Sequence, residues 1–308
     1  MAQHDPAPST MPIVDAHHHF WDPTRNYHPW LCDEPMIPFR YGDYSSIRQP
    51  YLPPDYFRDA GRHRVIKTVY VETEWDPKDS LGETRYIHEL ARETGFPNAV
   101  VAHARLHDAE AAELIAAHAA YPLVRSIRHK PASASHRSQA RRGALGSMDD
   151  PRWREGFSAL QRHGLHFDLQ TPWWHMDAAL ELARDFPGMQ IVVNHAGLPA
   201  DRSPEGLTGW RDAMGALAEA PNVAVKISGI GLGAGVPWTV EDNRPIVRSL
   251  IEQFGVDRCL FASNFPVDKV CASFDTLFSG FEASVQDLSE ADRRKMFHDN
   301  AMRIYRPA

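Results

Sequence analysis

The strongest constraint on the fold is a regular alternation of short apolar runs with longer amphipathic segments. Apolar or β-branched runs occupy residues 12–16, 66–72, 99–105, 124–128, 165–169, 190–194, 223–228 and 259–263. Helical patterns separate most of them, such as residues 83–94, which Gly95 ends, and residues 108–119, for which Asp108 is the expected N-cap. Eight strand-and-helix units in 308 residues favour an α/β fold of the (β/α)8 TIM-barrel type.

The predicted domain organisation is a flexible leader at residues 1–11 followed by a single barrel domain at residues 12–308. Two long connections interrupt the regular pattern, at about residues 22–60 and 130–150. The first is rich in proline and aromatic residues, which predicts a stiff segment folded over the barrel mouth. The second carries His136, Arg137, Arg141 and Arg142, which indicate either a solvated loop or a means of attracting an anionic substrate.

The composition limits the kinds of molecule that the protein is expected to bind. A net charge of −7 gives no support for nucleic-acid binding. Three cysteines are an odd number without metal-type spacing, which argues for reduced thiols. No run approaches the roughly 18 apolar residues of a membrane span, and no basic-then-apolar signal pattern opens the chain. We therefore expect a cytoplasmic protein that acts on a small molecule, with homo-oligomer formation left open.

Closely spaced histidines end the first predicted strand. Side chains alternate along a strand, so His17 and His19 should face one side and His18 the other. Two imidazoles on one face can share a divalent metal or polarise a carbonyl, although adjacent histidines can also simply cap a core strand. The other strands likewise finish in polar groups, and a barrel gathers such ends at one face: Glu72, His103 or Arg105, Arg128, His129, Asp168, Gln170, Asn194, His195, Lys226 and Asn264.

Five segments carry a family resemblance, in order along the chain: Val14–Asp22, Val69–Glu72, Ser126–His129, Val192–Gly197 and Phe261–Lys269. Together they resemble the amidohydrolase-related (amidohydrolase 2) family. The resemblance is to its branch of sugar-acid lactonases, such as fuconolactonase, and the pyrone dicarboxylate lactonase. It implies a (β/α)8 barrel with its site at the carboxyl ends of the strands, and it implies a hydrolase that opens a cyclic ester.

Two departures from the wider superfamily affect the expected mechanism. Many members have aspartate at the end of the eighth strand, where this chain has Asn264, and an amide cannot take a proton from water at neutral pH. Another base is then required, and Asp268 and Glu72 are the candidates. Where metal-dependent relatives supply a histidine on the fifth strand, this chain has Asp168 and Gln170, which argues against a two-metal centre.

The resemblance implies two versions of the site. In one, His17, His19 and either Glu72 or His195 hold one divalent ion, zinc or manganese, which polarises the lactone carbonyl and acidifies water. In the other, no metal is bound; the three histidines hydrogen-bond the carbonyl, and Asp268 or Glu72 activates water. The substrate is expected to be anionic or polyhydroxylated, and the residues expected to bind it are Arg128, His129, Lys226, His28, Trp30 and Tyr27.

Three other functions stay open from sequence alone. One is a metal-dependent decarboxylase of the same broad family. Another is an amide or ester hydrolase that acts on an acyclic substrate. The last is a sugar-acid binding protein without catalysis, which Asn264 makes conceivable because the usual base is missing.

Overall fold

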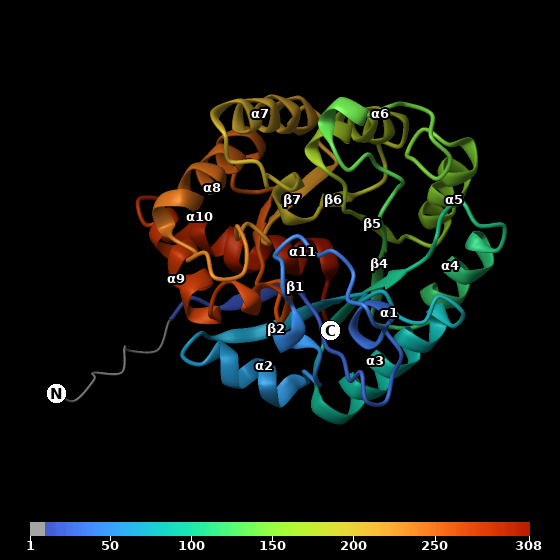
Figure 1. The fold of residues 1–308 in the computed structure, drawn as a ribbon, viewed down its shortest axis with the longest axis horizontal. Helices are drawn as coiled ribbons and strands as arrows, with labels where there is room; N and C mark the ends of the chain where they lie inside the picture. Colours follow the sequence, from blue (N-terminus) through green and yellow to red (C-terminus); the bar gives the residue numbers. More distant parts are fainter. Residues whose placement is uncertain (1–9) are drawn as a thin grey trace.

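The computed structural model describes residues 10–308, so most of the expected leader lies outside the described residues. Eight parallel strands form one sheet whose spatial order follows the chain order from β1 to β8 (Figure 1). This confirms the predicted (β/α)8 barrel, and each strand overlaps its predicted run. The strands are β1 (Ile13–His18), β2 (Val65–Val71), β3 (Ala99–His103), β4 (Val124–His129), β5 (His166–Leu169), β6 (Ile191–Val193), β7 (Val223–Ile227) and β8 (Cys259–Phe261).

Helices form a ring around the strands, as Figure 1 shows for α3 to α9. The long ones are amphipathic and bury their apolar side against the sheet. In the described part of the chain the helices are α1 (Pro29–Cys32), α2 (Pro53–Ala60), α3 (Ser80–Thr94), α4 (Ala111–Ala119), α5 (Pro151–Arg162), α6 (Met176–Asp185), α7 (Pro204–Ala218), α8 (Val240–Phe254), α9 (Phe274–Ser284), α10 (Glu290–Arg294) and α11 (Asn300–Tyr305). None of the helices within residues 10–308 has the length and apolar character to cross a membrane.

The structure confirms one of the two predicted helix ends and contradicts the other. Helix α3 ends at Gly95 as expected, because this glycine takes the left-handed conformation that a C-cap needs (φ 81°). The expected N-cap of α4 was wrong, since the helix begins after Glu110 instead of Asp108. The carboxylate of Asp108 instead lies 3.8 Å from the Arg105 side chain and 3.7 Å from that of His107, and it does not cap a backbone N–H.

A small apolar cluster fills the barrel interior. It combines side chains such as Val14, Val69 and Leu260 from the strands with Ile304 and Tyr305 from α11. Helix α11 therefore closes one end of the barrel, near the centre of the view in Figure 1. Substrate access is left to the opposite end, where the strands finish.

Asp15 joins the first strand to the last. Its carboxylate accepts from the backbone N–H of Ser263 at 2.9 Å and from the Ser263 hydroxyl, and Tyr56 of α2 donates to it at 2.7 Å. Beyond this point the backbones meet directly, because Asn264 N–H donates to the His17 carbonyl and His19 N–H to the Phe265 carbonyl, each at 2.7 Å. These contacts hold the ends of β1 and β8 together at the barrel mouth.

A register shift in β1 decides which histidines face inward. Val14 and Ala16 belong to the interior cluster, so strict alternation from them would also turn His18 inward. The pairing of β1 with β2 is irregular between Asp15 and His18, and this irregularity moves the inward side to His17 and His19. His18 instead packs outside the barrel against Phe20, Tyr56 and Tyr70.

The long connection after β1 folds back over the mouth, as its aromatic content predicted. It contains α1, a 3-10 turn (Ser45–Ile47) and α2. Trp30 packs against Trp21, Phe39 and Tyr44 at centroid distances between 5.4 and 6.0 Å. The connection after β4 is pinned by Arg142, which pairs with Asp149, Asp177 and Glu181. Arg142 is therefore committed to structural ion pairs.

Candidate active site

A cavity of about 390 Å³ opens at the carboxyl ends of the strands. Its polar lining comes from strand ends far apart in the chain, and Trp30 and Phe39 of the long connection after β1 form an aromatic wall. This cavity brings together several of the predicted site residues. The polar groups at its base are His19, Arg128, Gln170, His195 and Asn264.

Three predicted histidines contact one another at this point. The ring of His17 lies 5.0 Å from that of His19 and 4.6 Å from that of His195. Burial holds the pKa of each below its ordinary value of 6.5, to about 3 for His19, and nearby cations such as Lys226 and Arg128 lower the pKa values further. All three imidazoles are therefore neutral at near-neutral pH.

The hydrogen bonds of His19 fix its tautomer. Both partners of the ring can only accept, the Val71 carbonyl at 2.7 Å from Nδ1 and Asn264 Oδ1 at Nε2, and the shorter contact assigns the proton of the neutral ring to Nδ1. The lone pair is then on Nε2, which lies 3.3 Å from Oδ1 of Asn264. His19 is thus a proton acceptor that faces the cavity.

Asn264 is oriented by Asp268. The side-chain N–H of Asn264 donates to Asp268 Oδ1 at 2.6 Å, which turns its carbonyl oxygen toward His19. Tyr41 also donates to Oδ1 at 3.0 Å, and Gly229 N–H donates to Oδ2 at 3.1 Å. Burial raises the pKa of Asp268, and the hydrogen bonds together with Arg40, 3.8 Å away, oppose that rise. Asp268 is buried beneath the cavity and is not among the residues that line it.

His195 sits in a strained turn after β6. It adopts a left-handed conformation (φ 54°), as do Ala196 and Leu198. Its Nδ1 lies 3.1 Å from the Ser228 hydroxyl. Gly229 is required beside it, because a Cβ at that position would meet the imidazole of His195 at 2.6 Å. The glycine-rich segment after β7 therefore serves to let the backbone approach this histidine.

Arg128 lines the cavity and forms a buried pair with Glu72. Arg128 donates to the Glu72 carboxylate from Nε, to its backbone carbonyl from Nη2, and to Gln170 at 3.1 Å from Nη1. The second carboxylate oxygen of Glu72 accepts from Glu74 N–H at 2.8 Å. Burial would raise the pKa of Glu72, but the charge and hydrogen bond of Arg128 act together with His103 and Lys130 to lower that pKa to about 2. Such a carboxylate is a weak proton acceptor.

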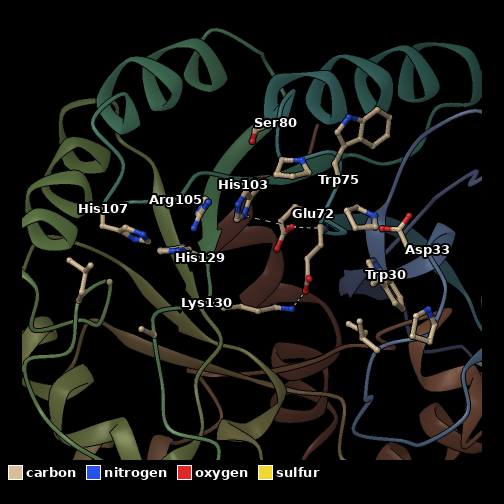
Figure 2. Close-up of a pocket in the computed structure, with 18 residues that line it drawn as sticks. Trp30, Asp33, Glu72, Trp75, Ser80, His103, Arg105, His107, His129 and Lys130 are labelled. Carbon is tan, nitrogen blue, oxygen red and sulfur yellow. Dashed lines mark hydrogen bonds and ion pairs between the residues drawn. The ribbon is translucent and has the colours of Figure 1, made fainter.

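A second cavity of about 630 Å³ adjoins the first. The two share the side chains of Trp30, Ile37, Glu74 and Lys130 as lining. Figure 2 shows His129, His103 and Arg105 on one side of it, Trp30 and Trp75 on the other, and Glu72 between them. Of the predicted substrate-binding residues, His129 and Trp30 line this cavity.

Three predicted substrate-binding residues line neither cavity. Lys226 is fully buried, and its Nζ lies 2.6 Å from Asp168 Oδ1, inside the barrel. His28 is buried between the Thr73 carbonyl and Trp75. Tyr27 is 44% exposed and donates to Asp33. Their expected role in substrate binding stays a prediction, and the structure places all three outside the lining of the two cavities.

The expected metal ligands do not form a ready metal site. Among the described residues, no three His, Cys, Asp or Glu side chains are grouped to hold one metal ion. Both ring nitrogens of His17 are buried without a hydrogen-bond partner, so this residue is free to ligate. Glu72, however, is committed to Arg128 and to the Glu74 N–H. The set of His17, His19, His195 and Glu72 therefore does not fit a metal in this arrangement, and no chemical step is assigned to one.

Sequence reasoning placed Tyr41 and Arg40 only in the loop expected over the barrel mouth, and it did not single out the pair formed by Lys130 and Glu74. Lys130 carried a usable signal, because it lies two residues after Arg128 and continues the same face of β4. No sequence signal pointed to Glu74, because a left-handed backbone conformation (φ 55°) directs it to the site and strand alternation does not predict such a turn. Tyr41 and Arg40 arrive from a loop whose path no periodicity predicts.

A parallel eight-stranded barrel with histidines, an asparagine and an arginine at its carboxyl mouth has the architecture of an amidohydrolase barrel. A family model described as amidohydrolase matches residues 14–306, and the chain belongs to that family. This confirms the resemblance seen in the sequence.

Several relatives resemble the chain over nearly its full length. The uncharacterized protein y4mH of Sinorhizobium fredii is 41% identical, covering 97% of this chain and 99% of that protein. An L-fucono-1,5-lactonase of Burkholderia ambifaria is 29% identical, covering 95% of each. A solved amidohydrolase of Burkholderia multivorans with bound zinc has a TM-score of 0.79 at 24% identity, covering 96% of this chain and 99% of that one. At this identity, the last comparison shows that the two proteins share a fold.

Proposed function

We propose that the protein is a lactonase that opens the cyclic ester of a sugar acid by attack of water. The observation that carries the proposal is the tautomer of His19, which presents a proton acceptor to the cavity beside a buried arginine. The full-length similarity to an L-fucono-1,5-lactonase supports the choice of a lactone over an acyclic ester. Lactone opening requires an activated water, stabilisation of the oxyanion and a proton for the leaving oxygen.

In the proposed mechanism, His19 Nε2 takes a proton as water adds to the lactone carbonyl. Asn264 Oδ1 then accepts a hydrogen bond from the new Nε2–H, which stabilises the imidazolium. The ester bond breaks next, and His19 returns the proton to the ring oxygen that leaves. This assignment makes His19 the base in place of Glu72, whose carboxylate is paired, and of Asp268, which orients Asn264.

The oxyanion is stabilised by donors that line the same cavity as His19. Arg128 supplies a permanent positive charge there, and its fixed bonds to Glu72 mean that little reorganisation accompanies the reaction. His195 supplies an Nε2–H when the Ser228 hydroxyl donates to its Nδ1. The developing negative charge also favours protonation of His19, which burial and Arg128 otherwise oppose.

The test is acid release at near-neutral pH from L-fucono-1,5-lactone and from a panel of other sugar-acid and pyrone lactones. Because lactones hydrolyse slowly in water, the control is the same protein concentration of His19→Ala. Acid release above this control supports lactone hydrolysis. Release of carbon dioxide from a carboxylated substrate would establish decarboxylation instead, and ligand-induced thermal stabilisation without turnover would establish a binding protein.

A further inference from the structure

The second cavity is the larger of the two, and it extends away from the reacting histidines. Its lining is divided in chemistry, as Figure 2 shows: His103, Arg105 and His129 lie on one side, and the indoles of Trp30 and Trp75 on the other. Neither side takes part in the proposed hydrolysis. A substrate that fills this cavity would contact both the basic side and the aromatic side.

Each of the three acidic residues of this cavity has a hydrogen-bond partner, and two of them are paired with a cation. Arg128 pairs with Glu72, Lys130 pairs with Glu74, and Tyr27 donates to Asp33 at 2.7 Å. Arg105 is the loosely paired charge, since its Nε lies 3.8 Å from Asp108 and its side chain is 56% exposed. At that distance and exposure the pairing is weak, so Arg105 is available to an incoming anion.

His129 is a fixed hydrogen-bond donor beside Arg105. Its Nδ1 accepts from the indole N–H of Trp153 at 2.9 Å and from the backbone N–H of Leu106 at 3.4 Å, and both partners can only donate. The proton of the neutral ring is therefore on Nε2. None of the described residues hydrogen-bonds to that Nε2, and the ring lines the cavity. His129 thus holds an N–H ready for an acceptor.

His103 also lines this cavity, but its buried Nδ1 lies 3.8 Å from the Glu72 carboxylate and faces the protein. A cavity with one loosely paired guanidinium and a fixed N–H donor suits a carboxylate, because guanidinium and carboxylate match in a forked geometry. The opposing indoles suit the C–H face of a sugar or another flat body.

We propose that this side of the second cavity binds an anionic substituent of the substrate, through Arg105 and His129, while Trp30 and Trp75 contact the substrate body. The inference rests on the proposed function and deepens it. The preferred substrate is then a lactone that also carries a carboxylate remote from its ester. The shared wall of Lys130 and Glu74 lies where such a substrate passes from one cavity to the other.

The experiment compares galactaro-1,4-lactone with galactono-1,4-lactone, which differ in having a carboxylate or a hydroxymethyl group at the far end. Wild type should prefer the carboxylated lactone by at least about tenfold in kcat/KM, the effect of one charge-assisted hydrogen bond. Arg105→Ala should lose that preference mainly through KM, with turnover of the neutral lactone changed less than about twofold. Arg105→Lys should restore part of it. Arg211→Ala, at an exposed arginine of α7, is the matched control.

Equal losses on both lactones in Arg105→Ala, or no preference in wild type, would overturn the inference while leaving the lactonase assignment intact. Thermal stabilisation by galactarate, the open dicarboxylate, separates the two ideas when neither lactone is hydrolysed. A shift present in wild type and absent in Arg105→Ala would then keep the anion site and reject the lactonase. A shift that persists in Arg105→Ala, or no shift at all, would reject the anion site.

Discussion

Arg128 donates to Glu72 twice, once to the side-chain carboxylate and once to the backbone carbonyl. A lysine has one compact donor group and cannot reproduce this fork. We expect Arg128→Lys to lower the free energy of unfolding by about 1–3 kcal/mol, measured in urea, and to lower kcat, because Arg128 is assigned to the oxyanion. Arg211→Lys, at an exposed position, should stay within about 0.5 kcal/mol of wild type. Equal stability of the two variants would show that the double contact contributes nothing.

Substitution of the histidines at the cavity should lower activity, whereas substitution of the outward-facing His18 should not. His19→Ala and His195→Ala are each expected to lower kcat/KM by at least about 10²-fold, since each removes a group that touches the reacting atoms. His18→Phe should retain activity within a few-fold, because His18 packs outside the barrel against Phe20, Tyr56 and Tyr70. Near-native activity in folded His19→Ala would remove that residue from the mechanism.

The orientation of Asn264 depends on the acceptor that Asp268 provides. In Asp268→Asn the amide of Asn264 is free to turn its N–H toward His19, which would then oppose protonation of the ring. We expect kcat to fall by about 10-fold or more while KM changes little, which stopped-flow or steady-state assays would measure. A rise in KM at constant kcat would instead assign Asp268 to substrate binding.

Stability should decrease on acidification. Burial holds the pKa values of seven histidines well below 6.5, so the unfolded chain binds more protons than the folded one below that pH. Each contributes a slope of up to about 1.4 kcal/mol per pH unit. Glu83, whose pKa burial raises to about 7, opposes this trend between its unfolded value and pH 7.

Urea denaturation at pH 7.5, 6.5 and 5.5 checks the slope. His18→Phe should reduce it by about one proton, because the two ring nitrogens of His18 are buried without partners. An unchanged slope in this variant would mean that His18 is protonated in the folded protein.

Chelation tests the role assigned to the histidines. Because Glu72 is engaged by Arg128 and by Glu74 N–H, we expect dialysis against a chelator to leave kcat unchanged. Metal content measured on the same sample provides the control. Loss of activity that zinc or manganese restores would contradict the mechanism proposed above, whether the third ligand is Glu72 or His195.

The barrel and the histidine cluster were predictable because both follow from local periodicity. Eight apolar runs define the strands, and β-strand alternation separates His18 from His17 and His19. The bulge that shifts the inward face within β1 was not visible, since a register shift leaves no local signature. It happened to preserve the predicted pairing of histidines, because alternation resumes after it.

The roles of Lys226 and Asp268 could not be read from the sequence because they depend on long-range partners. Lys226 faces Asp168, 58 residues away, inside the closed barrel. Asp268 meets Tyr41, 227 residues away, which arrives from a loop. The sequence shows which residue type ends a strand. Whether that side chain can contact substrate depends on the partner it binds in the folded protein, which the sequence does not show.

The meeting of β1 and β8 at the barrel mouth places the site where the first and last strands of the barrel come together. His19 and Asn264 are separated by 245 residues, so the proton acceptor and the amide that stabilises it can meet only after the whole stretch between them has been synthesised. Most of the barrel wall can assemble on the ribosome before any chemistry is available. Turnover is therefore a direct report of barrel closure, and a refolding assay that follows activity would time the joining of the first strand to the last.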